Sequence, residues 1–138
     1  MGSYRSFVQI NHAANDSDLT VTVPDLREYC LKAVFIDYSS TATVGNRIVT
    51  LDYKSGGVVH FSVRFLAVPA SQSNDILVGS IGGPFEPVET LAGEQHVGLP
   101  DIWLPAGFTL RIWDATAVDA AADDMLVNLW FEERSETT

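Results

Sequence analysis

The chain has 138 residues, of which 46% are hydrophobic, and its 18 acidic and 8 basic side chains give a formal net charge of −10. One domain of this length can bury a core without disulfides or metal ions, and this hydrophobic content excludes global disorder. The acidic balance argues against binding to nucleic acid, which needs clustered Lys and Arg, and against attraction to anionic membranes. No stretch approaches the ~18 apolar residues that a membrane span needs. We therefore expect neither nucleic acid nor a membrane as a partner.

The first 17 residues are mostly polar, with a short apolar patch that includes Phe7 and Ile10. They lack the apolar core of a signal peptide, and the single cysteine, Cys30, permits no intrachain disulfide. The sequence therefore predicts folding in a reducing cytosol, with an extended N-terminal arm at 1–17 and a single domain at 18–138. Because Cys30 lies in an apolar run, we expect it to be a buried structural thiol.

Alternating or continuous apolar runs between turn residues predict short strands along the rest of the chain. We expect strands at residues 19–23, 29–38, 44–53, 58–66, 74–81, 108–113 and 125–131, with shorter extended pieces near Val88 and Val97. The run from Lys54 to Gly57 predicts a hairpin, because its consecutive glycines permit the positive φ of a tight turn. In the strand after this hairpin, the residues expected to face inward are Val59, Phe61, Val63 and Phe65.

One short helical turn is expected at 118–125, where Thr116-x-x-Asp119 resembles a capping box and alanines favour helix. The other predicted elements are about eight short strands separated by Gly and Pro. This pattern predicts an all-β fold, an antiparallel β-sandwich or jelly roll.

The last two expected strands place tryptophans on the faces that point away from the core. Their inward residues are Phe108, Leu110 and Ile112 on one strand and Met125, Val127, Leu129 and Phe131 on the other. Trp113 and Trp130 lie on the opposite faces, and if the two strands are neighbours, both rings share one exposed face beside Leu126. Exposed tryptophans indicate contact with another molecule. These rings would be covered either by the N-terminal arm or by a second subunit, and the sequence leaves both possibilities open.

No pattern in the sequence indicates catalysis or a metal site. His12, His60 and His96 lack the paired spacing of metal ligands, and the Gly-x-Ser-x-Gly, phosphate-loop and dinucleotide motifs are missing. The acidic connector at 114–124 could bind calcium, but its carboxylates also suit strand ends and a helix N-terminus, so both interpretations stay open. We expect a protein that is not an enzyme and binds no cofactor.

Two segments, 34–49 and 104–125, resemble small β-sandwich virion proteins of tailed bacteriophages, namely decoration (cement) proteins of the head shell. The likeness rests on the motifs Thr41-Ala-Thr-Val-Gly-Asn-Arg47 and Leu104-Pro-Ala-Gly107. It implies a structural protein of the outer capsid surface, assembled in the cytoplasm of the bacterial host. The implied partners are the major capsid protein and further copies of the chain, most simply in a trimer.

Within this resemblance, the expected contact residues are Phe7, Ile10, Trp103, Trp113 and Trp130, with Arg47, Arg64 and Arg111 as partners for acidic groups. The alternative function is a carbohydrate- or receptor-binding β-sandwich of a phage tail, in which Trp103 would stack on a sugar ring. A hydrolase or metal-dependent barrel is a third possibility and would need converging ligands around a cavity.

Overall fold

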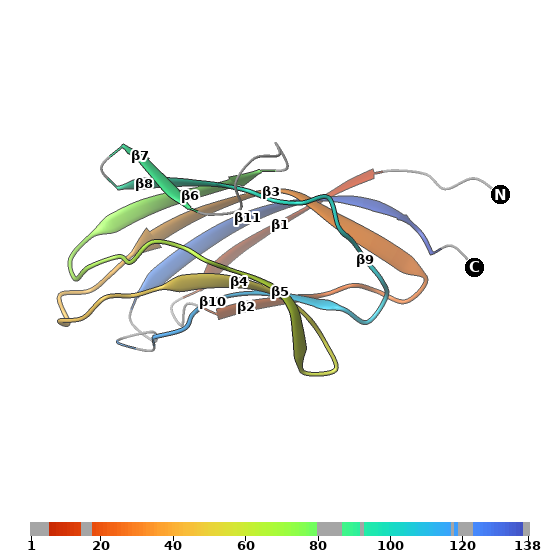
Figure 1. Ribbon diagram of the computed structural model, residues 1–138, viewed down its shortest axis with the longest axis horizontal. Coiled ribbons are helices and arrows are strands. Elements are labelled where there is room, and N and C mark those ends of the chain that lie inside the picture. The colour runs from red at the N-terminus through yellow and green to blue at the C-terminus, as the bar shows by residue number, and fades with distance from the viewer. Residues whose placement is uncertain are drawn as a thin grey trace.

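A computed structural model of the chain shows strands arranged in two sheets (Figure 1). The described residues are 6–14, 18–79, 87–91, 93–116, 118 and 123–136. Within them the strands are β1 (Ser6–Ala14), β2 (Asp18–Thr22), β3 (Arg27–Ser39), β4 (Val49–Ser55), β5 (Val58–Arg64), β6 (Ser73–Gly79), β7 (Val88–Leu91), β8 (Glu94–Gly98), β9 (Trp103–Leu104), β10 (Thr109–Asp114) and β11 (Asp124–Ser135). These residues contain no helix, and therefore none that could span a membrane. The predicted all-β fold class is confirmed.

The larger sheet has the order β1-β11-β3-β6-β8-β7, with β9 pairing with one end of β3, and the smaller sheet has the order β2-β10-β4-β5. The paired strands are antiparallel except for β6 and β8, which are parallel, a pairing that the predicted antiparallel fold did not include. In Figure 1 the two sheets lie one above the other. Both contribute to one buried apolar cluster, an arrangement consistent with the predicted β-sandwich.

Side-chain alternation along the strands determines which residues enter this core. On β11 the buried residues are the predicted Met125, Val127, Leu129 and Phe131. On β10, Leu110 and Ile112 are buried and face the core, also as predicted. The pairing of β3 with β11 shifts between Trp130 and Phe131, where β3 has one extra residue, Lys32. This bulge allows β3 to bury residues on both sides of Lys32 without disturbing the alternation on β11.

Residues 6–14, expected in an extended arm that covers a sheet face or contacts a neighbour, form edge strand β1 of the seven-stranded sheet. The strand pairs with β11 along its whole length, with Phe7 opposite Glu132 and Ile10 opposite Leu129. The segment therefore extends the sheet sideways and does not lie over a sheet face. The helical turn expected at 118–125 falls mostly on residues outside those described, and residues 118 and 123–125 are not helical.

The predicted hairpin at Lys54–Gly57 joins β4 to β5, and Gly56 and Gly57 have the positive φ angles that the turn requires, 56° and 80°. A bulge between Tyr53 and Lys54 interrupts the alternation just before the turn. As a result, Val58 and Val59 are 58% and 48% exposed, and the prediction that Val59 faces inward is wrong. Figure 1 shows the end of this hairpin extending away from the two layers.

Candidate functional site

Strand β11 carries apolar side chains on both of its faces. Its inner face contributes to the core, while Leu126 and Trp130 on the other side are 42% and 40% exposed. Alternation forces this result, because side chains at odd positions point to one side of the strand and side chains at even positions point to the other. Strand β11 therefore contributes one face to the buried core and the other face to an exposed apolar surface.

The register places further apolar residues beside Trp130. Residues directly opposite each other on paired strands point to the same side. Trp130 lies opposite Ala33, and Phe35 lies opposite Leu77 of β6. These neighbours are only partly buried. The surface that we call the outer face consists of Ala33, Phe35, Leu77, Leu126 and Trp130.

Two carboxylates lie in the adjacent row of the outer face. Leu126 is opposite Asp37, which is opposite Asp75 on the next strand. Like charges at directly opposite positions repel each other. Among the described residues, no Lys or Arg lies within ion-pair distance of either carboxylate. The outer face therefore combines an apolar patch with negative charge that no Lys or Arg in the described part of the chain neutralises.

Trp113 does not share this face with Trp130. It lies on β10, in the four-stranded sheet, while Trp130 belongs to the other sheet. The indole Nε1 of Trp113 donates a hydrogen bond to Asp52 Oδ2 at 2.9 Å, and the Arg111 guanidinium lies 3.8 Å from the ring centroid. Arg111 is in turn held by Asp18 through two hydrogen bonds of 3.0 and 2.8 Å. The predicted shared tryptophan face is wrong, because the connector carries the chain from one sheet to the other.

Trp103 lies on β9, opposite Cys30 of β3, and is half-buried. The guanidinium of Arg134 lies 3.9 Å from its ring centroid, and Arg134 Nε donates to Glu28 at 2.7 Å. One face of the indole is therefore already covered by a side chain that an ion pair holds in place. This contact connects β9 with β3 and β11 and occupies one face of the Trp103 ring.

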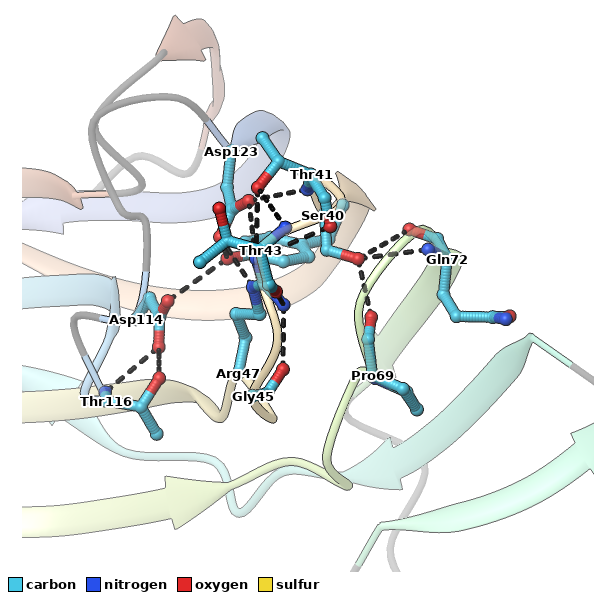
Figure 2. A network of polar contacts seen from close by, with 11 residues as sticks. Ser40, Thr41, Thr43, Gly45, Arg47, Pro69, Gln72, Asp114, Thr116 and Asp123 are labelled. Carbon is cyan, nitrogen blue, oxygen red and sulfur yellow. Dashed lines mark hydrogen bonds and ion pairs between the residues drawn. The ribbon is translucent and has the colours of Figure 1, made fainter.

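Arg47, expected to contact a partner protein, is instead fully buried (Figure 2). Its Nε donates to Asp123 Oδ2 at 2.9 Å, and its Nη1 donates to the carbonyls of Thr43 and Gly45 at 2.8 and 2.7 Å. Its Nη2 donates to the Thr41 hydroxyl at 3.1 Å. Arg47 is thus the centre of a polar cluster that ties the 41–47 loop to the start of β11.

Two buried carboxylates complete this cluster. The Tyr38 hydroxyl lies 3.0 Å from Asp123 Oδ2 and 3.2 Å from Asp114 Oδ2, and Asp114 Oδ1 accepts hydrogen bonds from the backbone N–H and the hydroxyl of Thr116. Burial disfavours the charged form of Asp123, but hydrogen bonds from Arg47, the Thr41 N–H and Tyr38 outweigh it and lower the pKa of Asp123. The described residues include no cluster of metal-ligating side chains, and Asp119 of the proposed calcium loop lies outside them.

The two segments that resemble virion proteins, 34–49 and 104–125, meet in this cluster. Thr41-Ala-Thr-Val-Gly-Asn-Arg47 supplies the arginine and its backbone acceptors, and the segment 104–125 supplies Asp114 and Asp123. The similarity therefore involves residues that stabilise one end of the two-sheet structure. It does not identify a surface for a partner.

The Arg47–Asp123 ion pair predicts a specific dependence of stability on pH. Because the pKa of Asp123 is lower in the folded state than its ordinary value of 3.8, its contribution is complete above that value and is lost as the pH falls through the folded-state pKa. We expect the difference in free energy of unfolding between wild type and Asp123→Asn to be constant between neutral pH and about pH 5, and to shrink below about pH 4. Urea unfolding of both proteins across this range measures it. An equal difference at pH 7 and pH 3 would contradict the assignment.

The remaining expected residues have separate environments. Arg64 is exposed on β5, and the side chains of Phe7 and Ile10 are outside what the structure describes. Cys30 is buried as expected, and burial raises the pKa of its thiol, which keeps it in the unreactive neutral form. His60 stacks on Phe108 with ring centroids 5.3 Å apart. The expected contact residues thus do not form one site.

Sequence reasoning missed most of the outer face. Phe35, Leu77, Asp37 and Asp75 were not among the expected contact residues. One signal pointed to Phe35: the run from 29 to 38 has apolar residues on both faces, which is typical of a strand covered on both sides. Which neighbours extend the patch depends on strand order, and strand order is not readable from the sequence.

No protein-family model matches this chain, and no curated protein matches it. Among solved structures, the chain is similar to one in the structure of infectious bursal disease virus Gx strain. The two are 8% identical, the match covers 96% of this chain and 39% of that one, and the TM-score is 0.25. This chain therefore spans less than half of the length of that protein, and a likeness at this TM-score carries no argument about fold or function.

Proposed function

We propose that this protein is a non-enzymatic structural protein of a virion, a decoration protein that self-associates and binds the major capsid protein of a tailed phage. In this proposal its two sheets form a jelly roll, and the assembled unit is a trimer on the outer capsid surface. Such a protein stabilises a shell by mass action, because it binds the assembled state and not its separate subunits. It needs contact surfaces and no reacting groups.

The outer face is the observation that carries this proposal. Trp130 and Leu126 are exposed on a sheet surface, next to the partly buried Phe35 and Leu77. Tryptophan surrounded by apolar side chains is typical of the centre of a protein interface, where burial contributes most of the binding energy. A regular sheet face suits a broad protein surface better than a small molecule, which binds in a concave pocket.

The charged side chains support a structural role. Arg27, Lys32, Arg111 and Arg134 form ion pairs with carboxylates of neighbouring strands, and Arg47 forms one inside the protein. These side chains hold strands together and do not converge on a common point. The carbohydrate-binding alternative assigned a central role to Trp103, and the Arg134 guanidinium already occupies a face of that ring.

The test is the variant Trp130→Asp. We expect it to fold, to self-associate poorly and thereby to lose most of its binding to capsids, because a carboxylate would be desolvated in the contact between copies. Co-sedimentation with expanded heads and with procapsids that lack this protein measures binding, and circular dichroism confirms folding. Thr22→Asp, an equally drastic change at an exposed position of the four-stranded sheet, is the matched control and should bind like wild type.

Three results would contradict the proposal. Wild-type protein that binds neither heads nor procapsids would exclude the capsid as partner. Binding by Trp130→Asp equal to that of wild type would exclude the outer face. A change in wild-type tryptophan fluorescence on addition of host polysaccharide, without capsid binding, would favour the carbohydrate-binding alternative.

A further inference from the structure

A second exposed apolar surface lies at the β4–β5 hairpin. Val58 and Val59 are exposed beyond the bulge that follows Tyr53. Lys54 lies opposite Val59, and Arg64 is exposed at the other end of β5. The surface that we call the hairpin surface consists of Lys54, Val58 and Val59 near the turn, together with Arg64, which lies opposite Thr50 at the far end of β5.

Its two cations are distinctive in this acidic chain. Among the Lys and Arg residues that the structure describes, all others form an ion pair with an Asp or Glu. Lys54 and Arg64 have no carboxylate within ion-pair distance in that part of the chain. The hairpin surface thus pairs exposed valines with unneutralised positive charge, whereas the outer face pairs exposed apolar side chains with the unneutralised Asp37 and Asp75.

The two surfaces have complementary charge, and they cannot contact each other within one molecule. The outer face belongs to the seven-stranded sheet, and the hairpin belongs to the other sheet and extends away from it (Figure 1). We propose that the outer face binds the hairpin surface of a second copy of this chain, head to tail. This inference rests on the proposed self-association and identifies the surfaces that produce it.

Electrostatics favour this contact over a symmetric one. In a face-to-face dimer, the Asp37–Asp75 pairs of two copies would lie against each other, each on a chain of net charge −10. A head-to-tail contact instead brings Lys54 and Arg64 to these carboxylates and relieves the repulsion between them. Contacts of this kind are heterologous, so they form a ring when the rotation between copies closes and a filament when it does not. In a three-membered ring, the outer face of each copy would bind the hairpin surface of the next copy, so all of these surfaces would be occupied.

Charge exchange tests the contact. The face variant carries Asp37→Lys and Asp75→Lys, the hairpin variant carries Lys54→Glu and Arg64→Glu, and a third protein carries all four changes. We expect each of the first two to weaken self-association by at least about tenfold. The third protein, and a mixture of the first two, should recover association close to that of wild type. Sedimentation velocity at micromolar concentration measures it, and association should weaken at high salt.

A mixing experiment separates head-to-tail from symmetric contact. Trp130→Asp lacks a working outer face, and Val58→Asp with Val59→Asp lacks a working hairpin surface. Each alone should be monomeric, and together they should form a 1:1 complex through the one intact contact. Circular dichroism of each variant confirms that these exposed substitutions leave the fold intact, and Asp37→Asn with Asp75→Asn provides a milder outer-face variant.

The outcomes distinguish this inference from the proposed function. A monomeric wild type, or failure of charge exchange to restore association, overturns the head-to-tail contact. If that monomer still co-sediments with capsids, the capsid-binding part of the proposed function stands, while self-association and the head-to-tail contact are both wrong. If the protein self-associates as described and ignores capsids, the contact is established and the proposed function is wrong.

Discussion

Asp123→Asn is expected to lower the free energy of unfolding by about 3–5 kcal/mol, because it leaves a fully buried arginine without its counter-charge. Arg47 donates to the Asp123 carboxylate at 2.9 Å, and both side chains have no solvent exposure. The asparagine keeps the shape of the side chain and one acceptor oxygen, so the loss reports on the charge. Urea unfolding at neutral pH measures it, and the exposed neighbour Asp124→Asn is the matched control, expected to change stability by less than about 0.5 kcal/mol.

A double variant separates the ion pair from the space that it fills. Removing one partner of the ion pair leaves the other as an unpaired buried charge, whereas removing both partners leaves no buried charge. We therefore expect Arg47→Met combined with Asp123→Leu to cost much less than the sum of the single changes. A loss below about 1 kcal/mol in Asp123→Asn would show that water reaches the arginine.

Phe131→Ala is expected to cost about 3–5 kcal/mol, and Trp130→Ala no more than about 1–2 kcal/mol, although tryptophan is the larger side chain. Phe131 is buried and its ring centroid lies 4.9 Å from that of Tyr29, so truncation leaves a cavity between the sheets. Trp130 lies on the outer face, where its ring is partly in water already. Thermal or urea unfolding of the monomeric proteins measures both losses.

This comparison uses neighbours on one strand, so the two sites differ mainly in burial. Equal losses for the two variants would place Trp130 in the core and remove the basis for an adhesive outer face. A larger loss for Trp130→Ala would have the same meaning. The expected order holds only if alternation along β11 separates interior from surface.

The sequence predicts local features of this protein well and non-local ones poorly. Alternation is a property of a single strand, so the buried faces of β10 and β11 and the turn at Gly56 and Gly57 are as predicted. Strand partners are a property of the whole chain. The assumption that β10 and β11 are neighbours therefore failed, and with it the shared tryptophan face.

The prediction that Arg47 lies at a contact surface was wrong for the same reason. Arg47 looked like a surface residue because its partner, Asp123, lies 76 residues later in the chain. A charged residue is buried only when a distant segment supplies its counter-charge and hydrogen-bond acceptors. Asp37 and Asp75 form the reverse case, since they lie opposite each other only through the pairing of β3 with β6. Their importance depends on a register that local patterns do not specify.

The pairing of β1 with β11 has a consequence for how the protein folds. These strands are the first and the last of the described strands along the sequence, and Ala14 of β1 lies opposite Met125 of β11. Because β11 lies between β1 and β3, the order of the larger sheet depends on this distant strand. Its pairing closes a long loop, and contacts between residues far apart in sequence make folding slow.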